Sequence, residues 1–307
     1  MSETMLEERL TIDDLARRME RASNRSKPLV TVYQNVYADS VIKALDPAFV
    51  PVDGRSNANT EFRENGLFIR MFISGLYQSA EYTGIVSPKF NEKAMISGEA
   101  FLEFVESNPG YDVYFVNPFP HNIYYTFNVW DHAEICHPGI TALADILFDE
   151  AGYDFRSVCD KRNDAKTALY SNFWVGNEPF WEGYMVFIMN IIDALERLPS
   201  GTRRLFFERD PDYPDPVPIL PFILERCPST FFSMFPEVRT KAYNFTREEI
   251  FQHLPRNEEA LIVPAFADWV DNVDAVGLYE PNTREVFRAI AHLRKMVAES
   301  GSTWRGG

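Results

Sequence analysis

Two short segments place polar side chains directly after predicted buried strands. Lys89 follows the apolar run Tyr82–Val86, and Asn117 follows a second apolar run at residues 111–116. In open α/β sheets, ligands bind just beyond the carboxyl ends of the strands. A lysine there can neutralise a diphosphate as a point charge, although a solvated surface lysine is the more common case. We therefore predict the chemistry at residues 87–90 and 117–121.

Polar residues also end the two strands predicted earlier in the chain. They are Gln34 and Asn35 after the strand at 29–33, Asp53 after the strand at 49–52, and Arg63 with Glu64 near the start of the next helix. The amides and the Asp53 carboxylate can hydrogen-bond the base and ribose of a nucleoside, and Arg63 can meet a phosphate. Ordinary turn polarity, and a carboxylate interacting with a helix dipole, explain the same residues without a ligand.

A third candidate is the segment at residues 130–137, where ionisable groups gather. They are Asp131, His132, Glu134 and His137. Such groups can bind a metal, supply a general base or hold sugar hydroxyls. The spacing is not that of HExxH, and no second His/Cys cluster follows. We expect residues 119–137 to form a hydrogen-bonded loop lining a polar pocket; alternatively, His137 only caps the next helix.

Two later positions put polar groups into apolar surroundings. Asn172 interrupts an aromatic strand predicted at residues 169–175, where an amide beside aromatic faces suits a sugar ring. A buried asparagine with internal hydrogen bonds is an equal alternative. Glu225 and Arg226 lie in an apolar helix predicted at residues 222–235, bent at Pro228. A charged pair in that setting must be paired internally or face a ligand.

Composition narrows the class of partner. The chain has 307 residues and a formal net charge of −15, which disfavours nucleic acid or an anionic membrane as a general partner. We find no run of 18 apolar residues and no signal-peptide core at the N-terminus. The 3 cysteines fit neither a disulfide framework nor a CxxC zinc pattern. We predict a cytoplasmic protein.

Strands alternate with helices along the chain, which indicates an α/β fold. We predict a helical arm at residues 1–27, a catalytic domain at 28–245 and a helical extension at 246–307. The arm contains an amphipathic helix at residues 4–23 that serves as a docking or dimerising element, so a homo-oligomer is possible. Ser97 and Asn177 are predicted helix caps, and Thr60 is predicted to cap a helix beginning at Glu61.

The order of these pieces resembles bacterial glycosyltransferases of the GT-A type, of the kind found in capsule and lipopolysaccharide biosynthesis. The stretches that carry the resemblance are FRENGLFIRMFISGLYQSAEYTGIVSPKF, YDVYFVNPF, WDHAEICHPG, YSNFWVGNEPFWEGYMVFIMNIIDALE and FILERCPSTFF. The resemblance implies a Rossmann-type mixed sheet flanked by helices, with a nucleotide sugar as co-substrate. The implied positions are Gln34, Asn35 and Asp53 at the nucleoside, Arg63 near the phosphates, and Asn117, His137, Asn172 and Glu225 around the sugar and acceptor.

One feature of that family is missing from this chain. GT-A enzymes often carry an Asp-x-Asp that binds a divalent metal, and Ser87-Pro88-Lys89 stands at the corresponding strand end. Without those carboxylates Mg²⁺ or Mn²⁺ has no obvious site. A divalent metal bound by carboxylates elsewhere stays possible, but we expect no metal ligands here and expect Lys89 to stabilise the departing diphosphate.

We therefore predict a glycosyltransferase that moves a sugar from a nucleotide donor to a glycan or lipid-linked acceptor. Glu134, His137 and Glu225 are the candidate bases for the acceptor hydroxyl. A non-catalytic carbohydrate-binding or assembly protein on the same scaffold is the main alternative. A glycoside hydrolase is a third possibility, and it requires two facing carboxylates about 5–10 Å apart.

Overall fold

The computed structural model describes residues 27–55, 62–208, 217–252, 254 and 256–303. The predicted amphipathic helix at 4–23 and the predicted cap Thr60 lie outside these residues. The first elements along the described chain are β1 (Val30–Val36), η1 (Asp39–Ala44), β2 (Val50–Asp53), α2 (Asn65–Ile73), η3 (Leu76–Gln78) and β3 (Tyr82–Val86). They are followed by α3 (Phe90–Ala94), α4 (Gly98–Ser107), β4 (Val113–Phe115), η4 (Pro120–Tyr124), α5 (Val129–Cys136), α6 (Ile140–Glu150) and α7 (Phe155–Cys159).

The second half of the chain is mainly helical. Its elements are β5 (Trp174–Gly176), α8 (Glu178–Arg197), α9 (Ser200–Leu205), α10 (Ile219–Leu224), α11 (Cys227–Met234), β6 (Thr240–Ala242), α12 (Arg247–Gln252), α13 (Asn257–Val276) and α14 (Thr283–Thr303). None of the helices in the described part of the chain combines the length and apolar composition that a membrane crossing requires.

The strands form one mixed six-stranded sheet in the order β2-β1-β3-β5-β4-β6. β1 pairs in parallel with β2 and β3, and β4 pairs in parallel with β6. β5 runs antiparallel to both of its neighbours, β3 and β4. The carboxyl ends of β1, β2, β3, β4 and β6 therefore meet at one edge of the sheet, where β5 begins. The predicted α/β class with a mixed sheet flanked by helices is confirmed.

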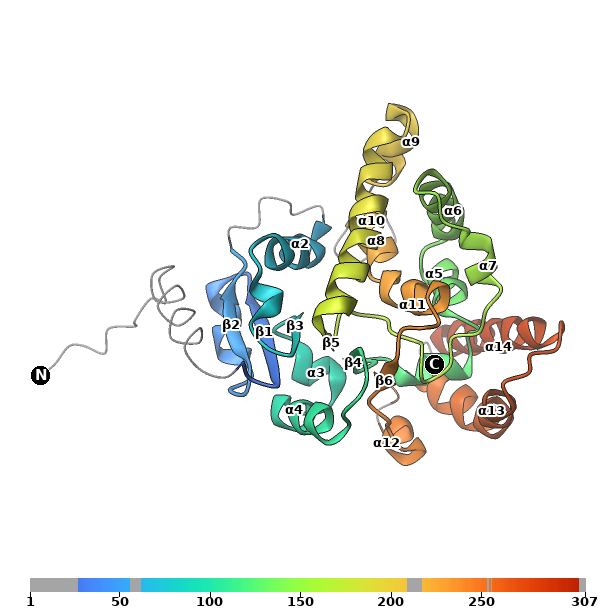
Figure 1. Ribbon diagram of the computed structural model, residues 1–307. Coiled ribbons are helices and arrows are strands. Elements are labelled where there is room, and N and C mark those ends of the chain that lie inside the picture. The colour runs from blue at the N-terminus through green and yellow to red at the C-terminus, as the bar shows by residue number, and fades with distance from the viewer. Residues whose placement is uncertain (1–26, 56–61, 209–216, 253, 255, 304–307) are drawn as a thin grey trace, which may run out of the picture.

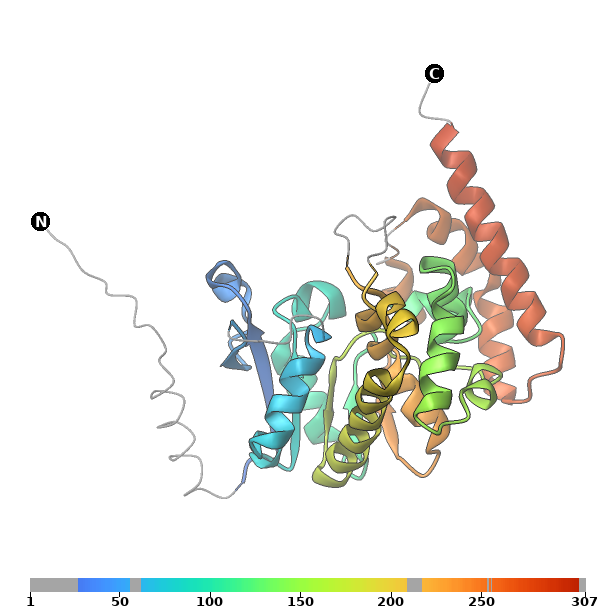
Figure 2. The same ribbon diagram turned by 90° about the horizontal axis from the view of Figure 1, so that it is seen from above.

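Both faces of the sheet are covered, because successive side chains of a strand point to opposite faces. In β4, Tyr114 packs into the cluster that contains Phe90 of α3 and Phe101 of α4. Val113 and Phe115 pack into the larger cluster on the other face. Figure 1 shows α2 and α8 on one side of the sheet and α3 and α4 on the other, and Figure 2 shows the same layers from above.

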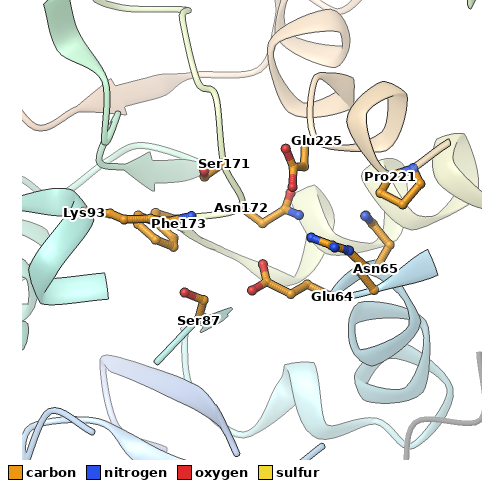
Figure 3. A pocket seen from close by; sticks show the side chains of 10 residues that line it. Glu64, Asn65, Ser87, Lys93, Ser171, Asn172, Phe173, Pro221 and Glu225 are labelled. Carbon is orange, nitrogen blue, oxygen red and sulfur yellow. The ribbon is translucent and has the colours of Figure 1, made fainter. Parts of the chain in front are cut away.

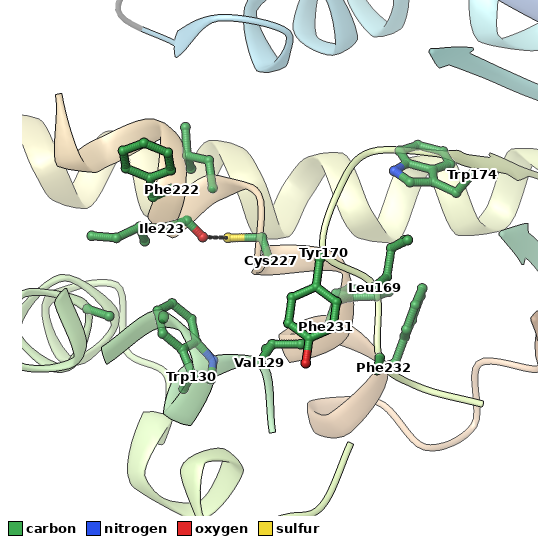
Figure 4. Close-up of a cluster of buried hydrophobic side chains, with 14 of the residues drawn as sticks. Val129, Trp130, Leu169, Tyr170, Trp174, Phe222, Ile223, Cys227, Phe231 and Phe232 are labelled. Atoms are coloured by element: carbon green, nitrogen blue, oxygen red, sulfur yellow. Dashed lines mark hydrogen bonds between the residues drawn. The ribbon is translucent and has the colours of Figure 1, made fainter. Parts of the chain in front are cut away.

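Aromatic side chains fill the larger cluster where α11 packs against α5 and the chain before β5. Trp130 donates to the Thr230 hydroxyl at 3.0 Å, and the buried Cys227 thiol contacts the Ile223 carbonyl oxygen (Figure 4). All three cysteines of the chain are free. This packing fixes the position of residues 221–225, which contribute to the site described below.

The contact between β3 and β5 requires a glycine. A Cβ atom on Gly84 would lie 2.0 Å from the Trp174 carbonyl oxygen. On the same strand, the Thr83 carbonyl oxygen accepts a hydrogen bond from the Trp181 indole at 2.7 Å. These contacts hold β3, the start of β5 and the start of α8 at fixed positions around one end of the sheet.

The local predictions were largely correct. Strands occur within a few residues of the predicted 29–33, 49–52 and 111–116, and β3 spans the predicted Tyr82–Val86. Ser97 and Asn177 each accept a hydrogen bond from the backbone of the following turn, as expected for helix caps. Helices also follow residue 246 as predicted. The boundary between a domain at 28–245 and an extension at 246–307 stays a prediction.

Three predicted bounds of strands and helices were wrong. The strand at 169–175 is reduced to β5, because the Leu169 backbone bonds to the Ser229 hydroxyl instead of to a neighbouring strand. The helix predicted at 222–235 is two helices, with Pro228 in the first turn of α11. The helix expected from Glu61 begins at Asn65.

The expected loop at residues 119–137 is also wrong, because it contains η4 and α5. Asn128 starts α5 by accepting hydrogen bonds from the Trp130 and Asp131 backbone. Its amide nitrogen donates to the carbonyl oxygens of Cys159 and Lys161. A single buried side chain thus satisfies both the helix start and a neighbouring loop.

Candidate functional site

A polar pocket lies at the carboxyl end of β3. It has a cavity volume of about 100 Å³. Its walls come from the turn before α2, the end of β3, α3, the chain before β5, and α10 with the residue after it. The lining residues are Arg63, Glu64, Asn65, Ser87, Lys93, Ser171, Asn172, Phe173, Pro221 and Glu225 (Figure 3).

The turn before α2 brings the first charged groups to the pocket. Arg63 has a φ of 46°, in the left-handed region that few residues other than glycine adopt. Glu64 follows at the N-cap position of α2, but its side chain makes no capping hydrogen bond. Its carboxyl group lies in the pocket wall instead. Backbone strain of this kind recurs at ligand-binding sites.

Two acidic side chains share the pocket. Burial raises the pKa of Glu64 to about 7, and the charge of Glu225 adds to that effect against the opposing charges of Lys93 and Arg63. Burial also raises the pKa of Glu225, which Arg226, Lys93 and Arg63 counteract. Because the Glu225 charge disfavours ionisation of Glu64, the pair holds a proton up to near-neutral pH.

Asn172 is buried in the pocket wall and has no hydrogen-bond partner within the described part of the chain. It is 2% exposed, and neither its side-chain oxygen nor its nitrogen is satisfied. A buried polar group left unpaired costs about 1–3 kcal/mol. Figure 3 shows the amide between the carboxyl groups of Glu64 and Glu225. The pocket therefore presents an unused donor and an unused acceptor beside two acids, which suits a ligand rich in hydroxyl groups.

Three of the residues predicted from sequence come together here: Arg63, Asn172 and Glu225. A fourth predicted residue, Gln34, does not line the pocket but binds the backbone of Ser87, which does. Its amide nitrogen donates to the Ser87 carbonyl oxygen at 3.2 Å, and its oxygen accepts from the Asp46 backbone at 2.7 Å. Gln34 therefore holds the end of β3 in place and does not line the pocket.

Asn35 and Asp53 lie at the ends of β1 and β2, outside the pocket. The Asp53 carboxylate is bound by Arg55, with its Nε at 2.9 Å. The Asn35 side-chain oxygen is buried beside Gly54 with no hydrogen-bond partner among the described residues, and a Cβ added to Gly54 would come within 1.9 Å of it.

The lysine of the pocket is Lys93, not the predicted Lys89. Lys89 is exposed at the N-cap of α3 and is absent from the pocket wall. Lys93 lies four residues further along, within α3, and its charge lowers the pKa of both acids. A positive charge after β3 is thus present, although at a different residue.

The other predicted residues lie elsewhere. The Glu134 carboxylate accepts hydrogen bonds from the Gly139 and Thr141 backbone and so caps the start of α6. His137, predicted as a candidate base or alternatively as a cap of that helix, ends α5 and stacks on the Phe222 ring, with 3.9 Å between centroids. Asn117 lines a separate small pocket near Tyr243 and accepts a hydrogen bond from the Phe119 backbone.

A second cluster of ionisable groups joins α13 and α14 to the core. Glu259 is 2% exposed and is paired with Arg294. The His121 ring nitrogen lies 3.7 Å from the other Glu259 oxygen, which has no hydrogen-bond partner. Burial and the charges of Arg294 and Arg256 lower the pKa of His121 to about 4. His121 is therefore neutral at physiological pH.

Within the described residues, no three or more His, Cys, Asp or Glu side chains form a group that can hold a metal ion. Asp131, which belonged to the predicted ionisable segment, is bound by Arg284 at 2.7 Å. Whether the protein uses a divalent metal stays a prediction.

The sequence analysis did not identify Lys93 and Asn65, and it named Glu64 beside Arg63 without choosing between a ligand site and an ordinary helix start. The only signal for Lys93 was its closeness to the end of β3. The signal for Glu64 was that the charged pair Arg63 and Glu64 comes directly before an apolar helix face. Neither pattern separates a pocket residue from a surface residue without the fold.

The fold and the pocket define an α/β protein with an acid-containing site at the carboxyl ends of its parallel strands. No protein-family model and no curated protein matches the chain. A solved structure that resembles it is that of WbbM, a bifunctional glycosyltransferase in its apo form, with 14% sequence identity and a TM-score of 0.38. The match covers 70% of this chain and 44% of that one, so the chain spans less than half the length of that protein. A similarity of this size does not bear on function.

Proposed function

We propose that the protein is a glycosyltransferase that moves a sugar from a nucleotide-sugar donor to a hydroxyl of a glycan or lipid-linked acceptor. The observation that carries the proposal is the unpartnered Asn172 amide between the carboxyl groups of Glu64 and Glu225. An amide with a free donor and a free acceptor pairs with neighbouring hydroxyls of a sugar, which both donate and accept hydrogen bonds.

The acids supply the proton transfer. A general base works best when its pKa lies near the operating pH, and the pKa of Glu64 is raised to about 7. In the proposed step, the ionised carboxylate of the Glu64–Glu225 pair takes the proton of the acceptor hydroxyl. The acceptor oxygen bonds to the anomeric carbon as the bond from that carbon to the diphosphate oxygen breaks. The nucleoside diphosphate leaves with the electron pair of that bond.

Arg63 and Lys93 supply positive charge for the departing diphosphate. Both line the pocket, and both act on the pKa of the two acids. Fixed cations placed where negative charge develops lower the barrier to the transition state. We assign to Lys93 the role that the sequence suggested for Lys89, and we propose that this charge replaces a divalent metal.

The volume of the pocket limits how much of a nucleotide sugar it can enclose. A cavity of about 100 Å³ corresponds to about three waters at their liquid volume, so it can enclose part of one sugar ring and not a whole nucleotide sugar. In the proposal the nucleoside lies further along the same edge, where Asn35 and Asp53 end β1 and β2.

A glycoside hydrolase is the second candidate, and the acid pair is the observation that favours it. A protonated carboxyl with a raised pKa beside a more readily ionised one is the arrangement that acid-catalysed glycoside cleavage uses. A carbohydrate-binding protein without activity needs Asn172 but has no use for the raised pKa of Glu64.

The test is an assay of UDP-, GDP-, CMP- and dTDP-sugars, each with EDTA or Mn²⁺. Thermal shift identifies the donor, because a ligand that binds the folded state raises the melting temperature. Release of the nucleotide is then followed with and without a glycan acceptor. Acceptor-dependent release in EDTA supports the proposal, and Glu225→Gln is expected to lower the rate at least about 100-fold.

Glu134→Gln is the matched control, because Glu134 caps α6 away from the pocket. It should leave the rate within about twofold of the parent, as surface changes usually do. Cleavage of a glycoside without any nucleotide would select the hydrolase instead. Binding of a glycan without turnover of any donor or glycoside would select the non-catalytic alternative.

A further inference from the structure

An apolar groove runs along α8 on the side of the molecule away from the polar pocket. Its cavity volume is about 620 Å³. Aromatic side chains line it, from the loop after α6, from α8 and from the end of α11: Tyr153, Phe180, Phe187, Phe231 and Phe235. Asp112, which directly precedes β4, lies at one end of the groove, so the groove is at the amino edge of that strand. Val186 of α8 lines it and is 51% exposed.

The rim of the groove is acidic. Asp112, Glu182 and Glu237 line it, and Asp112 is paired with Arg239 at 2.7 Å. Glu178, the first residue of α8, adds a further carboxylate one turn before Glu182. A ligand for this surface therefore needs an apolar stripe flanked by positive charge.

The chain itself enters the described structure beside this groove. The Lys27 ammonium lies 3.9 Å from the Glu178 carboxylate. From Glu178 the groove follows one face of α8 through Pro179, Glu182, Gly183 and Val186. Residues 1–26 precede this point and lie outside the described part of the chain.

Those preceding residues have the composition that the groove requires. Ile12, Leu15, Met19 and Ala22 are spaced by three, four and three positions, the spacing of one helical face. Between residues 17 and 25 there are four arginines and one glutamate, in a chain whose net charge is −15. This basic stretch is the part nearest to Lys27 and to the acidic rim.

We propose that residues 12–22 of the same chain bind in the groove. The apolar stripe contacts the aromatic floor and covers Val186, and the arginines face Glu182 and Glu237. The reach is sufficient, since the five residues from Ala22 to Lys27 span up to about 17 Å. The part of α8 from Glu178 to Val186 is about 12 Å long. The proposal is independent of the function proposed for the polar pocket.

The test is disulfide trapping in the full chain. Met19→Cys and Val186→Cys are combined in a Cys136→Ser background, because Cys136 is the exposed native thiol. The control pair joins Met19→Cys to Leu261→Cys, a 65% exposed position on α13 outside the groove. Mild oxidation should link the two introduced thiols, at positions 19 and 186, within one chain at a rate at least about tenfold above the control pair. Peptide mapping by mass spectrometry identifies the link.

Each other result overturns the proposal. Equal rates for the two pairs would mean that the segment does not prefer the groove. A covalent dimer linked through the same positions would mean that a second copy supplies the occupant. In a separate variant, Glu237→Lys should slow the trapping several-fold, whereas Glu248→Lys on α12, an exposed position outside the groove, should not. An unchanged rate in Glu237→Lys would remove the charge argument.

Discussion

The carboxyl group of Glu64, at the start of α2, and that of Glu225, after α10, face the same pocket, and the charge of Glu225 adds to the effect of burial in raising the pKa of Glu64 to about 7. The two residues come from opposite halves of the chain. Glu64 precedes α2 and Glu225 follows α10. Their coupling gives the pocket a proton that titrates near neutral pH. Several measurable properties depend on this relationship and on the side chains around it.

Replacing Glu64 by glutamine should change how stability depends on pH. The ordinary pKa of Glu64 is 4.5 and the folded pKa is about 7, so the fold favours the protonated form. The contribution is fully present below pH 4.5 and is lost as the pH rises through 7. The loss is at most about 3 kcal/mol. Denaturant unfolding of parent and Glu64→Gln between pH 4 and 8 measures it.

The comparison between the two proteins isolates Glu64 from other titrating groups. His121, whose pKa is lowered to about 4, changes stability in the opposite direction as the pH falls, and it does so in both proteins. The difference between their free energies of unfolding should therefore fall only where Glu64 titrates. Glu225→Gln should move that window to lower pH, since it removes a charge that raises the Glu64 pKa. A difference that is flat across the whole range would contradict the coupling.

Asn172→Ala should weaken ligand binding without weakening the fold. The Asn172 amide has no partner among the residues that the structure describes, so its removal breaks no hydrogen bond seen there. We expect the free energy of unfolding to change by less than about 1 kcal/mol, and the affinity for the sugar ligand to fall at least about tenfold. Calorimetric titration and denaturant unfolding measure the two effects.

Asn128→Ala is the matched control for Asn172→Ala. Asn128 is also buried, but it caps α5 and donates to two backbone carbonyls. Its removal should cost about 2–4 kcal/mol of stability. If Asn172→Ala destabilises the protein as much as Asn128→Ala does, the pocket amide has a structural role and not a ligand-binding one.

The two lysines after β3 should differ in their effect on diphosphate binding. Lys93→Ala removes a charge from the pocket wall, whereas Lys89→Ala removes an exposed charge outside it. We expect the affinity for a nucleoside diphosphate to fall about tenfold in the first variant and less than about twofold in the second. Thermal shift at several ligand concentrations separates them. The reverse order would restore the role that the sequence suggested for Lys89.

Arg294→Ala should destabilise the protein strongly. Arg294 pairs with Glu259, which is 2% exposed, and its removal leaves a buried carboxylate without its cation. Loss of one partner from such a pair costs about 3–5 kcal/mol. Arg288→Ala on the same helix breaks an exposed pair with Glu285 and should cost less than about 1 kcal/mol. Similar losses in both variants would show that α14 is not held by the buried pair.

Local patterns in the sequence determined the elements of the fold. Ser97 and Asn177 start helices because their side chains reach the backbone of the next turn, and that reach depends only on neighbours in the chain. The apolar β-branched run of β3 forms a strand for a similarly local reason. The α/β class follows from the alternation of such segments. The sequence also indicated Asn172 and Glu225 as site residues, because polar groups in apolar surroundings must face a partner.

Tertiary structure alone decided which polar residues meet. Asn128 and Ser229 changed the predicted loop and strand through hydrogen bonds to segments distant in sequence. Glu134 caps the start of α6, and His137 stacks on the Phe222 ring, so neither reaches the pocket. The reversed direction of β5 brings Asn172 to the end of β3, where the turn before α2 places Glu64. A strand end is a local property, but the residues that gather there depend on strand order and direction, which no neighbour in the chain specifies.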